Sequence, residues 1–258
     1  METLKVIKIG GNIIDNQEEL SAFLENFSKL KGPKILVHGG GKLATMLAHQ
    51  MNIKVKMIEG RRVTDKATLE IITMIYAGRI NKGIIAKLQA NKCNSIGFSG
   101  ADGNTIISIK RPVKKIDFGF VGDIVKVNTE TGNLLLNNNI TPVFCAITHD
   151  ANGQLLNTNA DTIASELAIA FADIFNVELY FCFEKKGVLK DINDDDSIIE
   201  KINSKNYQSL IDQGLIVDGM LPKLVNCFNA IKNNVKKVCV GTSEMLFNPS
   251  SKFTTIEI

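Results

Sequence analysis

The sequence alternates short apolar runs, rich in β-branched residues, with longer segments whose apolar residues recur at helical spacing. Lys34–His38 and Thr141–Ile147 are typical of buried strands, whereas Glu18–Lys31 and Asp161–Phe175 are typical of helices. Strands that alternate with helices favour a mainly parallel sheet whose crossover helices cover its faces. The sequence therefore predicts an α/β fold.

One stretch departs from this alternation. From Ser95 to Val127 the chain has short strand-like runs separated by glycine turns, at Ile96–Phe98, Thr105–Lys110 and Phe120–Val127. We expect this stretch to form a β-ribbon inserted over the main sheet.

The 258 residues are enough for one large domain or for two closely joined lobes, and we expect the lobes to meet near residue 175. The 30 basic and 27 acidic residues give a net charge of +3, which is too small and too evenly spread to indicate nucleic acid or a membrane surface as a partner. No uninterrupted apolar stretch reaches about 18 residues, and the first residues enter a strand pattern directly. We expect a soluble, cytoplasmic protein.

Five cysteines, an odd number without a CxxC pair, predict unpaired buried thiols in a reducing compartment. The acidic run 191–196 is typical of a solvated loop, because it lacks the alternating ligands of a calcium-binding loop. We therefore expect no metal site made by protein side chains.

Two predicted strands end in glycine clusters, Gly10-Gly11 after Lys8-Ile9 and Gly39-Gly40-Gly41 after His38. Glycine permits positive φ and a close approach of backbone N–H groups to an anion, and a helix that begins behind the turn adds a favourable dipole. A tight turn without a ligand is the alternative. We expect His38 to be a structural partner of the second turn. The P-loop, dinucleotide and protein-kinase signatures are missing, so a different fold would hold any phosphate.

Seven short segments occur in order along nearly the whole chain: KIGGN, VHGGGK, EGRRVTD, IGFSGADGN, GFVGDI, LNTNADTIASELA and DGMLPKL. Together they resemble the amino-acid kinase family, and within it the branch that phosphorylates N-acylated glutamate. This resemblance implies a three-layer αβα sandwich with a mainly parallel central sheet and an inserted β-ribbon. It also implies that lobe 1–175 binds the acylglutamate and makes a homodimer contact, and that lobe 176–258 binds ATP with Mg²⁺.

Position by position, the resemblance assigns roles to charged and polar residues. Lys8 and Lys223 match two phosphate-facing lysines, and Asp161 matches the carboxylate that orients both. Arg62 is similar to the residue that binds the α-carboxylate of the substrate, and Asn157 to a further substrate contact. From helix-capping preferences alone, we expect Asn159 to cap the helix that follows it.

Backbone groups complete the expected site, with Gly10 and Gly11 facing ATP and Gly40 and Gly41 facing the substrate. The chain departs from the family pattern in one segment. Where family members commonly have Ser or Thr followed by Asp, this chain has Phe183 and Glu184, followed by two lysines. We expect Glu184 and Lys186 to contact ATP, with Lys185 and Lys186 in solvent as the alternative.

The implied activity is ATP-dependent phosphorylation of the γ-carboxylate of N-acetyl-L-glutamate, in arginine biosynthesis. Arg61, which precedes Arg62 where an apolar residue is usual, suggests N-succinyl-L-glutamate as an alternative acceptor, with Arg61 as the partner of the extra carboxylate. An Arg61 side chain that points to solvent is the alternative to this role. A non-catalytic protein that senses acylglutamate or ATP is a second alternative.

Overall fold

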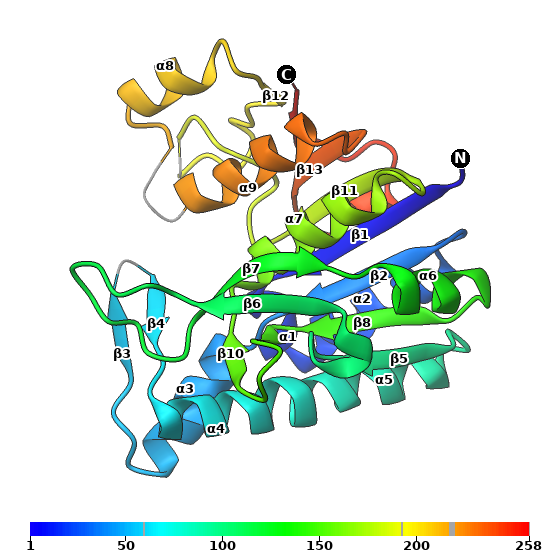
Figure 1. Cartoon of the computed structure of the whole chain (residues 1–258). Helices are drawn as coiled ribbons and strands as arrows, with labels where there is room; N and C mark the ends of the chain where they lie inside the picture. The colour runs from blue at the N-terminus through cyan, green and yellow to red at the C-terminus, as the bar shows by residue number, and fades with distance from the viewer. Residues whose placement is uncertain (59, 192, 217–219, 258) are drawn as a thin grey trace.

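Eight strands form one central sheet in the computed structural model, which describes residues 1–58, 60–191, 193–216 and 220–257 (Figure 1). Every pairing from β13 to β5 is parallel, and only β13 and β14 pair in the antiparallel sense. The predicted mainly parallel sheet is thus confirmed. Glu59, Asp218 and Gly219, which belong to two of the motifs, lie outside the described residues. In sheet order the strands are β12 (Lys201–Ile202), β14 (Thr254–Ile256), β13 (Lys237–Gly241), β11 (Asn176–Cys182), β1 (Thr3–Ile9), β2 (Lys34–His38), β8 (Thr141–Cys145) and β5 (Ser95–Phe98).

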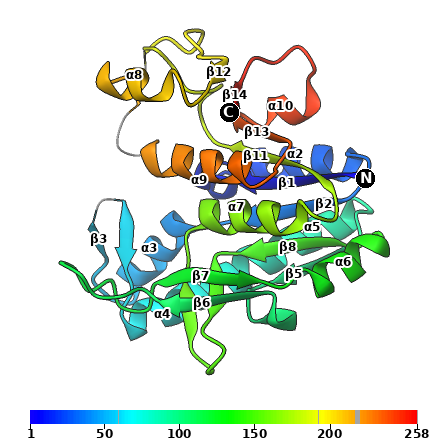
Figure 2. The ribbon, with the colours of Figure 1, turned by 45° about the horizontal axis from the view of Figure 1, so that its top comes forward.

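Helices cover both faces of this sheet and give the expected three layers (Figure 2). On one face, α7 packs against β1, β2 and β11, and α9 lies beside α7 and against β13. On the other face, α2 packs against α5, and α5 also contacts β5 and β8. The α-helices are α1 (Gly11–Asp15), α2 (Gln17–Lys29), α3 (Gly41–Gln50), α4 (Lys66–Thr73), α5 (Asn81–Ala90), α6 (Glu130–Asn137), α7 (Ala160–Phe171), α8 (Tyr207–Asp212), α9 (Leu221–Lys232) and α10 (Glu244–Phe247).

The helices α4 and α5 are joined without a break by a π-helical segment, Met74–Ile80. Such segments are uncommon, and they often occur at functional sites because they alter which side chains share a face. Here the segment buries Tyr76 and Ile80 against the glycine turn that follows β2.

A second, four-stranded sheet lies beside α7 and has the order β10-β9-β6-β7. Its strands β6 (Ile106–Lys110) and β7 (Gly122–Val127) form the antiparallel ribbon that the sequence predicted. The assignment of Ile96–Phe98 to this ribbon was wrong, because these residues lie in β5, which pairs parallel with β8 at the edge of the main sheet. The remaining strands are β9 (Ile147–His149), β10 (Leu155–Asn157) and the hairpin strands β3 (Lys56–Ile58) and β4 (Arg61–Val63).

All five cysteines are buried and unpaired, as predicted. Burial raises the pKa of Cys145 and Cys182 to about 12, so these thiols remain protonated at neutral pH. They act as small apolar side chains of the core.

The parallel arrangement brings the carboxyl ends of β1, β2 and β11 to the same edge of the sheet, which we call the carboxyl edge. In open α/β sheets ligands bind outside the carboxyl ends of the strands. Both glycine turns lie at this edge, since Gly10 follows β1 and Gly39 follows β2. The backbone N–H of Gly10 donates to the Cys182 carbonyl at 3.0 Å, which ties the first turn to the end of β11.

We predict that Gly40→Ala lowers the free energy of unfolding by about 2–5 kcal/mol. Gly40 has a φ of 149°, and an added Cβ would overlap Cδ1 of Ile80 and lie 3.1 Å from the Tyr76 ring. Urea unfolding would measure the change. Gly83→Ala is the control, because nothing lies within 4 Å of its added Cβ and Gly83 is inside α5, where alanine is the better helix former. Equal stability of the two variants would contradict the prediction.

Candidate active site

Two lysines and one aspartate meet at the carboxyl edge. The Lys8 Nζ lies 2.7 Å from one carboxylate oxygen of Asp161, and the Lys223 Nζ lies 2.8 Å from the other. The three side chains are only 10–17% exposed. We call Lys8, Asp161 and Lys223 the lysine–aspartate cluster, and the sequence had placed these three residues together.

Each member of the cluster is positioned by a different element. Lys8 is the second-last residue of β1, and its side chain points to the face of the sheet that α7 covers. Asp161 lies in the first turn of α7, where the Asn159 side chain accepts hydrogen bonds from the Asp161 and Thr162 backbone N–H groups. The predicted helix cap at Asn159 is thereby confirmed. Lys223 lies in the first turn of α9, directly after Pro222, a residue that helices tolerate at this position.

Electrostatics within the cluster favour the charged form of Asp161, and burial holds the pKa of Lys8 below its ordinary value. Burial alone raises the pKa of Asp161, but the two ammonium groups outweigh burial, and the pKa of this carboxyl lies well below its ordinary value. Burial lowers the pKa of Lys8, Asp161 raises it again, and the nearby Lys223 charge lowers it further. One carboxylate between two ammonium groups leaves a net charge of about +1 that an anionic ligand can neutralise.

Arg62 reaches the second glycine turn from the β3–β4 hairpin. Its Nη2 donates to the Gly41 carbonyl at 2.9 Å and to Thr45 Oγ1 at 2.8 Å, and the residue is 8% exposed. The guanidinium also hydrogen bonds to the buried Tyr76 hydroxyl, whose pKa is raised by burial and lowered in part by Arg62. Arg62 is therefore held against Gly41 by residues of α3 and of the π-helical segment.

Asn157 lies at the end of β10, and its side-chain amide donates to Thr64 Oγ1 at 3.0 Å. Thr64 in turn donates to the Arg62 carbonyl at 3.1 Å. These bonds connect Asn157 with Arg62, two residues to which the sequence assigned substrate contacts.

His38 holds the second glycine turn in place, as the sequence suggested. Its Nδ1 lies 2.9 Å from the Gly39 carbonyl oxygen and its Nε2 lies 3.0 Å from the Asn81 side-chain amide. Burial lowers the pKa of His38 to about 4, so the ring is neutral at pH 7, with Nδ1 donating and Nε2 accepting. The bond orients the Gly39 carbonyl, which is the structural role expected for His38.

Sequence reasoning missed three residues that support the site. These residues are Thr45, Tyr76 and Asn81, none of which belongs to a pattern that indicated a site. The apolar spacing of 64–91 gives no signal for a π-helical turn, and single polar residues in a helix are usually solvated.

The remaining predicted site residues lie in exposed surroundings. Arg61 is exposed on β4, and because strand residues alternate, its side chain points away from the buried side occupied by Arg62. Glu184 is also exposed. Lys186 is ion-paired with Asp196 at 2.6 Å, which raises the pKa of Lys186. Their assigned ligand contacts remain predictions.

The described residues contain no group of three or more His, Cys, Asp or Glu side chains that could hold a metal ion. Asp161 forms ion pairs with two lysines, Lys8 and Lys223. In the acidic segment, Asp195 forms an ion pair with Lys185, and Asp196 forms one with Lys186.

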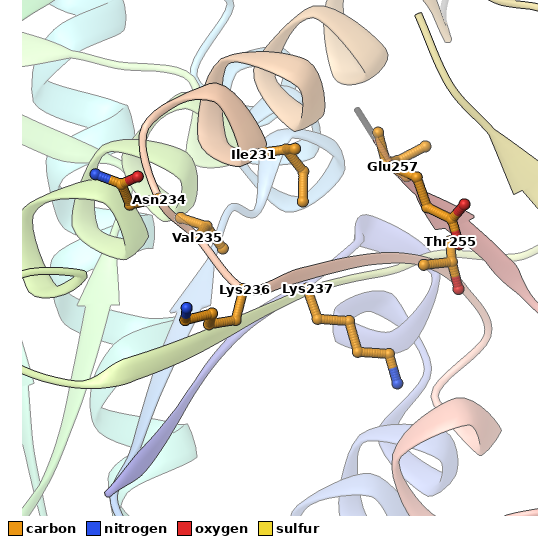
Figure 3. A pocket seen from close by; sticks show the side chains of 8 residues that line it. Ile231, Asn234, Val235, Lys236, Lys237, Thr255 and Glu257 are labelled. Atoms are coloured by element: carbon orange, nitrogen blue, oxygen red, sulfur yellow. The ribbon is translucent and has the colours of Figure 1, made fainter. Parts of the chain in front are cut away.

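One surface pocket lies away from this site. Figure 3 shows it between the end of α9 and the strands β13 and β14, with Lys236, Lys237 and Thr255 among its lining side chains. Lys237 begins β13, whereas Val240 near its other end is in register with Phe181, the partner of Lys8. The pocket therefore lies at the opposite end of the sheet from the lysine–aspartate cluster.

A surplus of buried positive charge lies at the carboxyl edge, where both glycine turns also lie, and such an arrangement is suited to an anionic ligand. A family model described as the amino acid kinase family matches residues 3–242. The chain belongs to this family.

Several relatives match nearly the full length. The chain is 54% identical over 247 residues to an acetylglutamate kinase of Cytophaga hutchinsonii, covering 95% of this chain and 94% of the relative. It is 51% identical over 239 residues to an acetylglutamate kinase of Phocaeicola vulgatus, covering 93% of each chain. Acetylglutamate kinase of the more distant Methanopyrus kandleri is 32% identical over 248 residues, covering 94% of this chain and 96% of the relative.

Solved structures show the same architecture. That of smu.665 from Streptococcus mutans UA159 has a TM-score of 0.78 at 25% identity and covers 98% of each chain. Carbamate kinase from Giardia lamblia, bound to AMP-PNP, has a TM-score of 0.69 at 13% identity and covers 99% of this chain and 98% of its own, which supports the fold alone. None of the helices in the described residues has the length and apolar character needed to cross a membrane.

We predict that the stability difference between the protein and Asp161→Asn depends on pH. At pH 7 the variant leaves two buried ammonium groups without a counter-charge, which costs about 3–5 kcal/mol. Because the folded pKa of Asp161 is depressed, its contribution is present above the ordinary pKa of about 3.9 and is lost as the pH falls toward the folded value. Urea unfolding from pH 7 to pH 3 should therefore show the difference shrinking below about pH 4.

Glu25→Gln is the control for this measurement, since Glu25 forms an exposed ion pair with Lys29 on α2. This variant should remain close to the unchanged protein throughout the pH range. A stability difference for Asp161→Asn that stays constant from pH 7 to pH 3 would contradict the assigned charge state.

Proposed function

We propose that the protein transfers the γ-phosphoryl group of ATP to the γ-carboxylate of N-acetyl-L-glutamate, and so forms an acyl phosphate in arginine biosynthesis. The observation that carries the proposal is the lysine–aspartate cluster at the carboxyl edge. The relatives named acetylglutamate kinase, which match over more than 90% of the chain, support the same reaction.

The charge pattern of the cluster suits this reaction. A γ-carboxylate has an ordinary pKa of about 4.3, so it is ionised at neutral pH and needs no general base. The difficulty is that an anion must approach a polyanion, so catalysis rests on positioning and on charge neutralisation. Lys8 is proposed to neutralise the transferred group, Lys223 the leaving β-phosphate, and Asp161 to orient both lysines.

The second half of the site is proposed to hold the acceptor. Arg62 has five N–H donors in a planar fork, and its two bonds to Gly41 and Thr45 use only Nη2. The donors not used by these bonds or by the Tyr76 hydroxyl are suited to the α-carboxylate of the substrate. Asn157 is proposed as a further contact, together with the backbone N–H groups of Gly40 and Gly41.

ATP is proposed to lie over the other side of the cluster, against the N–H groups of Gly10 and Gly11, with Glu184 and Lys186 as outer contacts. Lys186 would then exchange Asp196 for the nucleotide. The Mg²⁺ ion is treated as part of the substrate, held by phosphate oxygens, because the described carboxylates do not form a metal site. Bound in this way, it supplies positive charge to the phosphate chain.

The division into an acylglutamate lobe, 1–175, and an ATP lobe, 176–258, places the boundary between β1 and β11, which pair at the middle of the sheet. The cluster joins both parts, with Lys8 and Asp161 from the first and Lys223 from the second. A homodimer in the cytoplasm, with the first lobe at the interface, completes the proposal.

The alternative acceptor, N-succinyl-L-glutamate, is not favoured. Arg61 was its proposed partner, and Arg61 is exposed on the side of β4 away from Arg62. A non-catalytic sensor is also disfavoured, since a protein that only binds its ligand has no need of two lysines held on one carboxylate.

We predict that the protein with ATP and Mg²⁺ forms an acyl phosphate from N-acetyl-L-glutamate, which hydroxylamine traps as a hydroxamate. The kcat/KM should favour the acetyl over the succinyl substrate by about tenfold or more, since Arg61, the proposed partner of the extra carboxylate, lies on the exposed side of β4. A reversed preference would assign the succinyl substrate. No product from either acylglutamate would indicate a binding protein without turnover.

A further inference from the structure

The ammonium group of Lys223 lies over two aromatic rings. Its Nζ is 5.1 Å from the ring centroid of Phe181 and 5.8 Å from that of Phe183. The two residues are two positions apart along an extended segment, so their side chains point to the same face. With only 10% of its side chain exposed, Lys223 has Asp161 on one side and aromatic carbon on the other.

The two rings differ in their surroundings. Phe181 is fully buried within β11 and in register with Lys8, so its ring belongs to the core. Phe183 follows the end of β11 and is half-buried at the carboxyl edge. Its backbone N–H donates to the Gly241 carbonyl at 2.9 Å, and its Cα would lie 3.7 Å from a Cβ added to Gly10. The ring of Phe183 is thus anchored next to the first glycine turn.

An ammonium group in this position has lost most of its hydration, and its counter-charge is shared. Asp161 serves Lys8 and Lys223 at once, so each lysine receives only part of one negative charge. An aromatic face carries negative potential, and it attracts a desolvated cation within about 6 Å of its centroid. Unlike a second carboxylate, a ring provides this attraction without cancelling the charge that the phosphates require.

We propose that Phe183 is a positioning residue for Lys223. Its ring face holds the ammonium group at the carboxyl edge when the ammonium turns from Asp161 toward the phosphates. Phe183 itself does not touch the reacting atoms and acts only through Lys223. This inference rests on the proposed function, to which it adds an aromatic residue at the carboxyl edge.

Removal of the ring tests the inference. Phe183→Leu keeps an apolar side chain and should lower kcat about 3- to 30-fold, with the KM for N-acetyl-L-glutamate changed less than about twofold. Phe183→Tyr retains the ring face and should keep kcat within about twofold of the unchanged protein. Equal losses in both variants, or no loss in Phe183→Leu, would overturn the role.

Phe27→Leu is the control. The Phe27 ring of α2 also has a lysine ammonium over it, with the Lys34 Nζ at 5.4 Å from its centroid. Lys34 begins β2, at the end of the strand opposite the carboxyl edge. This variant removes an equivalent contact far from the lysine–aspartate cluster and should leave kcat unchanged.

Fluorinated phenylalanines at position 183 separate electrostatics from packing. Each ring fluorine weakens the negative face with little change in size, so log kcat should fall stepwise from zero to three fluorines. A flat series would show that the ring only fills space.

A spectroscopic measurement covers the case in which the proposed function fails. In protein with ¹³C-labelled lysine, the Lys223 ε-CH₂ signal should be shifted upfield by the ring currents, and Phe183→Leu should reduce this shift. If the protein is inactive but the Lys223 signal is ring-shifted, the proposed reaction is contradicted, whereas the contact between Phe183 and Lys223 is supported. A signal unaffected by Phe183→Leu would refute the contact whatever the activity.

Discussion

The single carboxylate of Asp161, shared by the ammonium groups of Lys8 and Lys223, is the interaction on which the rest of the site depends. Without it two positive charges would converge in a nearly dry space and repel each other. With it the site keeps a surplus positive charge in a fixed place, where a phosphoryl group can take over as counter-charge. The carboxylate therefore stabilises the fold and prepares the site for its ligand at the same time.

The parallel sheet explains why this arrangement can be built from distant parts of the chain. Parallel pairing of β1, β2 and β11 brings three strand ends to one edge, and the first turns of α7 and α9 add Asp161 and Lys223 there. Helix N-termini carry partial positive charge, which favours both the carboxylate and an incoming phosphate. Gly40 completes the edge, since only glycine fits its positive φ beneath Tyr76 and Ile80.

From the sequence alone we could predict those features of the fold that depend on the local pattern of apolar residues. Apolar periodicity predicted the α/β class and most strands, and the resemblance to the amino-acid kinase family implied that Lys8, Asp161 and Lys223 lie together. Prediction from the sequence failed where partners are far apart along the chain or where the pattern is ambiguous. Ile96–Phe98 was expected in the ribbon but pairs with β8, and no local pattern indicated that Tyr76, in the π-helical segment, contacts Arg62. The exposure of Arg61 follows from strand alternation once the hairpin register is known.

The central claim is that the two lysines work as one unit through Asp161. A double-mutant cycle on kcat with Lys8→Met, Lys223→Met and the double variant tests it most directly. Each single change should lower kcat about 10²- to 10³-fold. The double change should lower kcat far less than the product of the two, because losing one lysine gives the whole Asp161 charge to the other and restrains it. Losses that multiply, or near-normal turnover in either single variant, would contradict the account.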